Sequence, residues 1–257
     1  MNAAVLSHLW SSPDAWIFTI ILSATFPAAG ILLLRRLLSR APKDGGIKKL
    51  QVYACIILSE WAFVAALLWI TDRHALTLVD LGEYAGDARL TLAVTLALLI
   101  VIAVMAYFNF RQIRRSAPEK LEAEIGTLKH FLPESKPEIA VFVVIAFTAG
   151  ICEELLYRGW LQNLIAAGTG SVWAGLLLGA VIFGCGHAYQ GKNGMIQTGI
   201  IGLIFGGVFL LTGGLLAGQI LHVSIDAVNG IVGGYALSLL KADAATREAQ
   251  KPAQGSR

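Results

Sequence analysis

Long apolar runs, separated by short polar segments, set the pattern of this chain. Seven runs come close to the roughly 20 residues that a helix needs to cross the hydrocarbon of a bilayer. They cover residues 15–34, 50–70, 90–110, 138–157, 172–188, 194–212 and 215–240. Backbone N–H and C=O groups inside lipid must find partners within the chain, so such runs are expected to be helices. The pattern predicts an all-α, polytopic transmembrane helix bundle of about seven spans.

Polar residues divide the predicted bundle into unequal parts. The first three runs clearly indicate membrane spans, whereas the last four are interrupted by glycines and polar residues. We expect residues 1–136 to form an N-terminal transmembrane scaffold, in which an amphipathic segment at 119–133 lies on the cytoplasmic membrane surface. Residues 137–240 then form a second bundle that carries nearly all the intramembrane polar groups. The polar tail at 241–257 is predicted to be disordered.

The composition agrees with a membrane protein. Hydrophobic residues make up 56% of the chain and charged residues 14%, and the mean hydropathy is +0.67. A soluble domain carries about 25% charged residues, so this chain has too few charges to cover a surface that faces water. Membrane lipid is therefore an expected partner. Nucleic acid is not, because the chain has neither a basic patch interleaved with aromatic residues nor a glycine-rich phosphate loop.

The three cysteines, Cys55, Cys152 and Cys185, all lie in apolar runs and form no CxxC pair. A disulfide framework or a zinc knuckle is not expected from this pattern. We interpret them as small buried apolar residues.

The placement of Lys and Arg predicts the topology. Basic residues gather in 35–49, in 111–136 and in the C-terminal tail, whereas the loop 71–89 holds two basic residues against four acidic ones. Short cytoplasmic loops carry the excess of Lys and Arg. The N-terminus is therefore expected outside and the C-terminus in the cytoplasm, which agrees with an odd number of spans.

Two adjacent carboxylates, Glu153 and Glu154, stand at the end of the fourth apolar run. Neighbours on a helix point about 100° apart, so the two face different surroundings. Arg158 follows Glu154 by four residues, a spacing that favours an ion pair. Glu153 would then be free to face a cavity as a general base. The alternative is that both glutamates mark the water interface at the end of the span.

Two further polar patches lie in later runs. Phe183 and His187 are four residues apart and share a helix face, and the glycines between them allow close helix approach. Farther on, a stripe with spacings of three, four and three residues holds Gln219, His222, Asp226 and Asn229. Such a stripe could bind helices together or line a water-filled cavity, and the presence of an imidazole with a carboxylate favours the cavity.

Together these patches put carboxylates and imidazoles on three predicted helices. A charged group at the centre of a span costs at least about 2.5–3.5 kcal/mol, and helix bundles build sites from facing side chains. We therefore expect Glu153, His187, His222 and Asp226 to converge. Glu60, in the second span, is expected to be a buried, hydrogen-bonded carboxyl, with an addition to the cavity as the alternative.

The three motifs resemble a known signature. Glu153-Glu154-x-x-x-Arg158, Phe183-x-x-x-His187 and His222-x-x-x-Asp226 are similar in order, spacing and residue type to the motifs of the CaaX protease and bacteriocin-processing family. Its members are intramembrane endopeptidases related to the CaaX prenyl endopeptidase. The resemblance covers roughly residues 138–240, and it implies that 137–240 is the catalytic bundle.

The resemblance also implies roles. Glu153 would activate a water molecule with help from His187, and His222 with Asp226 would steady the oxyanion formed from a peptide carbonyl. The family pattern allows Asn or Asp at position 226. An ionised aspartate donates no hydrogen bond, so Asp226 must be protonated, orient His222 or bind a metal. Asn229, one turn further on, could donate instead.

The cofactor is left open by the resemblance. Glu153, His187, His222 and Asp226 could ligate a divalent metal such as zinc, but the chain lacks the usual HExxH helix, and members are described both as metalloproteases and as glutamate-dependent proteases. The implied partner is a peptide or protein substrate, membrane-anchored in one version of the hypothesis. The implied location is the prokaryotic cytoplasmic (inner) membrane.

Two other functions are compatible with the same residues. One is a non-catalytic bacteriocin-immunity or regulatory membrane protein, because some relatives are linked to immunity. The other is a proton-coupled transporter, because intramembrane carboxylates and histidines also form proton relays. A transporter is the weaker alternative, since the sequence shows no repeated halves.

Overall fold

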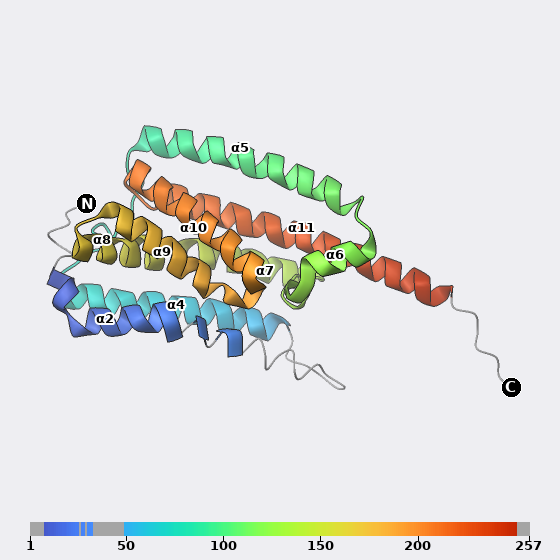
Figure 1. Ribbon diagram of the computed structural model, residues 1–257, viewed down its shortest axis with the longest axis horizontal. Helices are drawn as coiled ribbons and strands as arrows, with labels where there is room; N and C mark the ends of the chain where they lie inside the picture. The colour runs from blue at the N-terminus through green and yellow to red at the C-terminus, as the bar shows by residue number, and fades with distance from the viewer. Residues whose placement is uncertain (1–7, 26, 29, 33–48, 251–257) are drawn as a thin grey trace.

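The described residues form helices and connecting turns, without a β-strand among them (Figure 1). The structure is a computed structural model that describes residues 8–25, 27–28, 30–32 and 49–250. Most of the basic stretch expected at 35–49 therefore lies outside the described residues, as do the end of the first predicted span and the last residues of the tail. The all-α prediction is confirmed for the part of the chain that the structure describes.

The first half of the chain holds the N-terminal elements and two long helices. They are η1 (His8–Ser11), α2 (Pro13–Ile20), the π-helix η2 (Ile21–Thr25), α4 (Lys49–Arg73), α5 (Ala88–Ile113), α6 (Pro118–Ile125) and the 3-10 helix η3 (Gly126–His130). The second half begins with α7 (Lys136–Glu153), which continues without a break into the π-helix η4 (Glu154–Gln162) and then α8 (Asn163–Thr169). It ends with α9 (Val172–Gly186), η5 (Ala188–Gln190), α10 (Gly191–Thr212) and α11 (Leu216–Ala249).

Six helices among the described residues are long and apolar enough to cross a membrane. They run over Pro13–Leu32, Lys49–Arg73, Ala88–Ile113, Lys136–Thr169, Ala188–Thr212 and Leu216–Ala249. The remaining predicted span corresponds to α9, which has 15 residues. Such a helix rises about 22 Å, less than the roughly 30 Å of hydrocarbon. The polytopic architecture is thus confirmed, with six long helices and one shorter apolar helix where seven spans were predicted.

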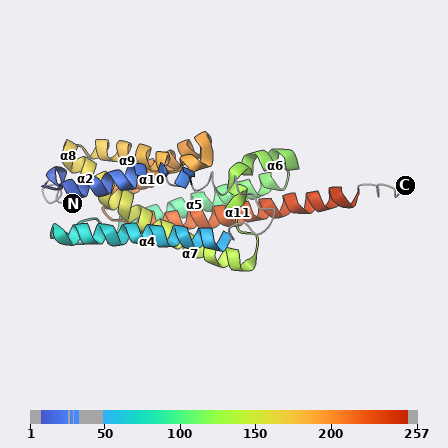
Figure 2. The ribbon, with the colours of Figure 1, turned by 90° about the horizontal axis from the view of Figure 1, so that it is seen from below.

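The site is built around α7 and α11, which pack against each other through a close contact. A side chain at Gly150 of α7 would approach the backbone nitrogen of Val223 to 2.9 Å and the carbonyl oxygen of Gln219 to 3.1 Å. Such small residues let two helices approach closely. Around this pair, α4 packs on α7, α5 packs on α11, and α9 packs on α10 (Figures 1 and 2).

The fourth span is longer than predicted. We expected it to cover 138–157 and considered that Glu153 and Glu154 mark its end at the water interface. The structure instead has one continuous helix over Lys136–Thr169, with both glutamates in its interior and Glu154 completely buried. The helix need not end at these carboxylates, because Glu154 finds a cation and an imidazole inside the bundle.

The C-terminal segment is also more ordered than predicted. Residues 241–249, which we assigned to a disordered tail, continue α11 as helix. Alanines favour this extension, and Arg247 adds ion pairs to Glu119 of α6 at 2.7 Å and to Asp243 at 2.8 Å. The prediction of disorder was therefore wrong for this stretch.

The amphipathic segment packs mainly on protein. Its apolar residues Leu121 and Ile125 are buried against Ala236 of α11. Beside it, Glu134 pairs with both Lys49 and Lys241. Partial burial raises the pKa of Glu134, but the two lysines outweigh it, so the pKa lies below its usual value. This cluster brings the start of α4, the start of α7 and the end of α11 to the same end of the bundle.

The cysteines differ from the prediction of three buried apolar residues. Cys152 is buried, whereas Cys55 and Cys185 are exposed on the outside of the bundle, and all three are free thiols. In a membrane-spanning bundle the outward positions face lipid, so an exposed cysteine in an apolar run meets the same kind of surroundings as a buried one.

Candidate active site

The two adjacent glutamates lie where α7 becomes the π-helix η4. A π-helix has a wider turn than an α-helix and occurs frequently at functional sites. Glu153 is the last residue of α7 and Glu154 the first of η4. Because successive side chains point in different directions, the two carboxylates enter different environments.

Glu154 connects η4 to α11. Its Oε1 atom lies 3.0 Å from Nη1 of Arg158 and 2.8 Å from Nδ1 of His222. The carboxylate is fully buried, and Gly218 of α11 leaves room for it, since a Cβ there would lie 3.0 Å from Oε2. The ion pair expected from the four-residue spacing is present, and the hydrogen bond to His222 is an additional link.

Arg158 is buried with its charge matched on several sides. The guanidinium carbon lies 4.2 Å from the ring centroid of Phe183 and 5.6 Å from that of Phe205, and Nη2 donates to the carbonyl of Gly202 at 3.4 Å. Aromatic faces attract a guanidinium, and an ion pair removed from water needs such additional partners. Phe183 therefore covers Arg158 as well as contacting His187.

His222 is held in one orientation by Glu154. Because the carboxylate paired with Arg158 can only accept, Nδ1 of the ring must carry the proton. Nε2 then faces Oε2 of Glu153 and Oδ2 of Asp226, both at 3.7 Å. This separation exceeds a hydrogen bond, so Nε2 is not committed to either carboxylate.

Glu153 differs from its neighbour in having no fixed partner. Its side chain is 16% exposed, and its Oε2 atom is buried without a hydrogen bond within the part of the chain that the structure describes. Oε2 of Glu154 is buried without a hydrogen bond as well, but its Oε1 atom holds a cation and an imidazole, whereas Glu153 has neither at hydrogen-bond distance among the described residues.

His187 follows directly after the end of α9. Its Nδ1 lies 3.0 Å from the carbonyl oxygen of Phe183, and its ring centroid lies 4.8 Å from that of Phe183. With Nδ1 donating to this carbonyl, Nε2 is the nitrogen left for chemistry. The ring centroid of Phe183 also lies 6.2 Å from that of His222, which brings the C-terminal end of α9 close to α11.

The polar stripe of α11 separates into different contacts. His222 and Asp226 face Glu153, as described above. Gln219 instead donates to both carboxylate oxygens of Glu83, at 2.9 Å each, and so fastens the loop between α4 and α5. Asn229 is exposed and has no hydrogen-bond partner among the described side chains. The stripe therefore does not line one cavity along its whole length.

Sequence reasoning missed a second set of contacts between η4 and α10. Gln162 donates through Nε2 to the carbonyl of Gly206 at 3.4 Å, one turn along from the contact of Arg158 with Gly202. A side chain at Gly206 would come within 2.6 Å of the Gln162 amide oxygen. The equal four-residue spacing of the two polar residues and of the two glycines was the available signal.

The metal hypothesis is not supported by the donor arrangement. Among the described residues, no group of three or more His, Cys, Asp or Glu side chains could hold a metal ion. Nδ1 of His222 is committed to Glu154, so Nε2 is the ring nitrogen of His222 that faces Glu153 and Asp226.

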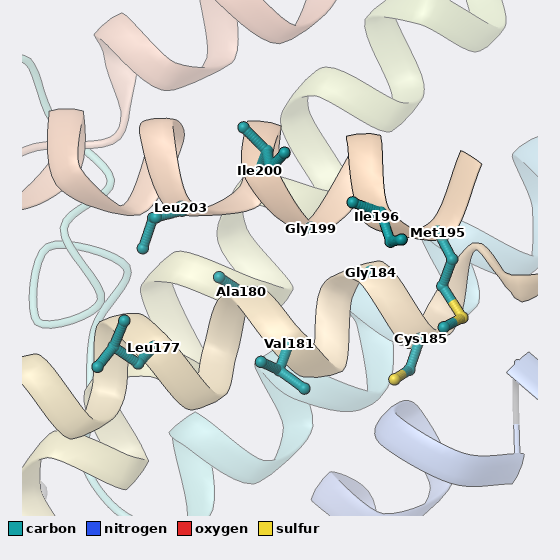
Figure 3. Close-up of a pocket in the computed structure, with 10 residues that line it drawn as sticks. All are labelled: Leu177, Ala180, Val181, Gly184, Cys185, Met195, Ile196, Gly199, Ile200 and Leu203. Carbon is teal, nitrogen blue, oxygen red and sulfur yellow. The ribbon is translucent and has the colours of Figure 1, made fainter. Parts of the chain in front are cut away.

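A groove of about 310 Å³ opens between α9 and α10, next to these residues (Figure 3). Its walls are apolar side chains and glycine backbone, with Cys185 and Met195 at one end (Figure 3). It contains none of the site's carboxylates or imidazoles. A side chain at Gly184, on its floor, would lie 2.8 Å from the carbonyl oxygen of Met195, which shows how closely the two helices approach.

Comparison with known proteins identifies one family. Residues 135–228 match the family model described as "Type II CAAX prenyl endopeptidase Rce1-like". Searches of curated proteins and of solved structures gave no match. The matched segment contains α7, η4, α9, α10 and the part of α11 that carries His222 and Asp226. With six apolar membrane-length helices among its described residues, this chain is an integral membrane protein whose residues 135–228 are similar to the Rce1-like type II CAAX prenyl endopeptidases.

Proposed function

We propose that the chain hydrolyses a peptide bond inside the membrane with Glu153 as the general base. One observation carries this assignment. Glu154 holds both Arg158 and His222 at its Oε1 atom, whereas the adjacent Glu153 has no hydrogen bond among the described residues and its Oε2 atom lies 3.7 Å from Nε2 of His222. Two neighbouring carboxylates with such different partners are suited to different tasks.

The reaction uses the two imidazoles for different purposes. Glu153, assisted by Nε2 of His187, takes a proton from a water molecule, whose oxygen attacks the peptide carbonyl. His222, protonated on both nitrogens, donates through Nε2–H to the oxyanion, and a donor in this position is worth several kcal/mol in acyl transfer. Asp226 balances the charge of the imidazoles. Glu153 then passes its proton to the leaving amine, which returns the site to its starting state.

The substrate reaches this site from the membrane, and we propose a peptide or protein that is itself membrane-anchored. We propose that the protein lies in the inner membrane of a prokaryote, and that the C-terminal end of α11 is on the cytoplasmic side. In support, Lys49, Glu134 and Lys241 gather at one end of the bundle, while the acidic loop with Glu83 lies at the other (Figure 1). The excess of Lys and Arg marks the cytoplasmic side.

A cleavage assay in liposomes tests this function. Purified protein is reconstituted with a library of fluorogenic peptides attached to lipid anchors, and wild type is compared with His187→Gln. Loss of an assisting acid–base group should lower kcat about 10²–10⁴-fold, with KM little changed. Cys185→Ala, two residues away and exposed, serves as control. Failure of the wild type to cleave, with full biological function in His187→Gln, would favour a non-catalytic role.

Asp226 can be tested by its two replacements. Asparagine keeps a polar group and adds an N–H donor toward the oxyanion, so Asp226→Asn should retain at least about one tenth of the wild-type kcat. Leucine removes both charge and hydrogen bonding, and Asp226→Leu should lose about 100-fold. The measurement is kcat for both variants in the same liposomes. Equal loss in the two variants would show that the carboxylate charge itself is required.

A further inference from the structure

An open hollow of about 600 Å³ lies at the corner where α5 ends and α6 begins. Three of the side chains that line it are cations, namely Arg111 in the last turn of α5, Arg115 in the connecting turn and Lys120 in the first turn of α6. Phe108, one turn before Arg111, adds an aromatic ring to the same wall. Figure 1 shows this corner beside the C-terminal part of α11, and the hollow is lined by none of the candidate active-site residues.

The two arginines of the hollow have no carboxylate partner among the described residues. Arg111 donates to the hydroxyl of Tyr107 at 3.3 Å, and its guanidinium carbon lies 5.7 Å from the centre of that ring. These contacts orient the guanidinium and leave most of its five N–H donors free. Arg115 bonds within the described chain through its backbone N–H, and its guanidinium finds no partner there. Lys120 lies 3.8 Å from Glu124, in an exposed pair that contributes little.

Two of the three acidic residues of α6 pair with cations outside the hollow. Glu119 lies 2.7 Å from the guanidinium of Arg247 in α11, and Glu122 lies 3.2 Å from the ammonium of Lys129. Because these carboxylates are engaged elsewhere, three cations of the hollow are opposed by Glu124 alone among the acidic residues of this helix. A concave surface that carries charge of one sign attracts ligands of the opposite sign, so the hollow favours an anion.

The order of side chains along α5 places the hollow at the depth of the lipid headgroups. In the middle of the helix, apolar residues such as Ile100 and Val104 are exposed on the outside of the bundle. The exposed rings of Tyr107 and Phe108 come next, and the arginines follow them. Aromatic rings gather at the membrane–water interface, and long cationic side chains reach from there to the headgroups. This placement is the same whichever side of the membrane the corner faces.

We propose that the hollow binds the phosphate of an anionic phospholipid headgroup. Arg111 and Arg115 donate to the phosphate oxygens, since a planar guanidinium can bond two of them at once. Lys120 adds a positive charge from the α6 side, and Phe108 packs against the apolar part of the lipid. Basic pockets beside membrane helices bind headgroups of this kind. The aromatic wall favours a lipid over free inorganic phosphate, which would use the cations alone. The inference does not depend on peptide cleavage.

Native mass spectrometry of the full chain in detergent tests the site without an enzyme assay. The probes are phosphatidylglycerol and phosphatidylcholine with the same two oleoyl chains, so that the headgroup charge differs while the apolar surface does not. The wild type should bind phosphatidylglycerol at least about fivefold more tightly, the ratio expected for one basic contact at a membrane surface. Equal binding of the two lipids, or binding of neither, would overturn the proposal. Displacement of the lipid by inorganic phosphate at equal concentration would assign the hollow to free phosphate and contradict a lipid site.

Matched substitutions then separate the hollow from the general positive charge of this end of the bundle. Arg111→Gln and Arg115→Gln should each weaken phosphatidylglycerol binding about fivefold and leave phosphatidylcholine binding unchanged. Arg115→Lys keeps the charge but loses the planar fork, so its affinity should fall between those of Arg115→Gln and the wild type. Arg114→Gln removes the same charge from an exposed neighbour that does not line the hollow, and it should bind as the wild type does.

The stability of these variants is measured alongside binding. The substituted side chains are exposed, so the midpoint of thermal unfolding in detergent should not change, and a loss of binding then reports on the site itself. An equal loss of phosphatidylglycerol binding in Arg114→Gln and Arg115→Gln would show diffuse electrostatic attraction and would overturn the assignment of a site.

Discussion

Replacing Glu153 by glutamine is expected to abolish peptide cleavage while the protein still inserts and folds. The amide has the size of the carboxyl but cannot accept a proton, so the water molecule is no longer activated. We expect kcat to fall by about 10⁴-fold, the upper end of the range for loss of a general base. Glu153→Ala should behave in the same way. The assay is cleavage of lipid-anchored peptides in liposomes, with thermal unfolding in detergent to measure stability.

The structure explains why stability should survive this change. Oε2 of Glu153 has no hydrogen bond within the described chain, so the amide breaks none at that atom. Glu122→Gln, at an exposed ion pair with Lys129, is a matched control for loss of one carboxylate charge. Full proteolysis by Glu153→Gln would sink the assignment of Glu153 as the base, even if the family activity stands.

Replacing Arg158 by methionine is expected to have the largest effect on stability. Methionine fills similar space but leaves Glu154 buried without a cation. Breaking a buried ion pair on one side costs about 3–5 kcal/mol, a large part of the stability of a typical protein. The contacts of the guanidinium with Phe183 and Gly202 are lost as well. We expect a large fall in the midpoint of thermal unfolding in detergent, or loss of folded protein.

The double variant Arg158→Met with Glu154→Leu separates charge from packing. It removes the uncompensated carboxylate, so it should be more stable than Arg158→Met alone, although inactive because His222 loses its orienting partner. Arg111→Met is the control, since this exposed arginine bonds to the hydroxyl of Tyr107 and lies over its ring, and the change should alter the free energy of unfolding by no more than about 0.5 kcal/mol. An unchanged midpoint in Arg158→Met would show that the Glu154–Arg158 pair does not hold the bundle.

The sequence by itself determined the class of fold and predicted the groups of the candidate site. Apolar runs of membrane length can only be helices, since lipid offers no partner for backbone N–H and C=O groups. The cost of charge in lipid singled out Glu153, Glu154, His222 and Asp226. The spacing of Glu154 and Arg158 predicted their ion pair, because residues four apart are neighbours on one helix whatever lies around it.

Only the tertiary structure decided which groups from different helices meet. Periodicity tells which face of a helix a residue occupies, but not which helix packs there. Gln219 and His222 lie on one stripe, yet one bonds Glu83 of a loop and the other Glu154 of η4. These choices depend on the close contact of α7 with α11 at Gly150, which brings His222 to Glu154.

The same reason explains the two largest departures from the sequence prediction. In the sequence, the adjacent carboxylates Glu153 and Glu154 are compatible with the end of a span. In the structure, Glu154 finds partners inside the bundle, and the helix continues from Lys136 to Thr169. Glu60 was expected to be a hydrogen-bonded carboxyl, yet its Oε2 atom is buried without a hydrogen bond among the described residues. The packing of α4 against α7 accompanies the burial of this carboxyl, and such long-range packing is what local sequence patterns do not encode.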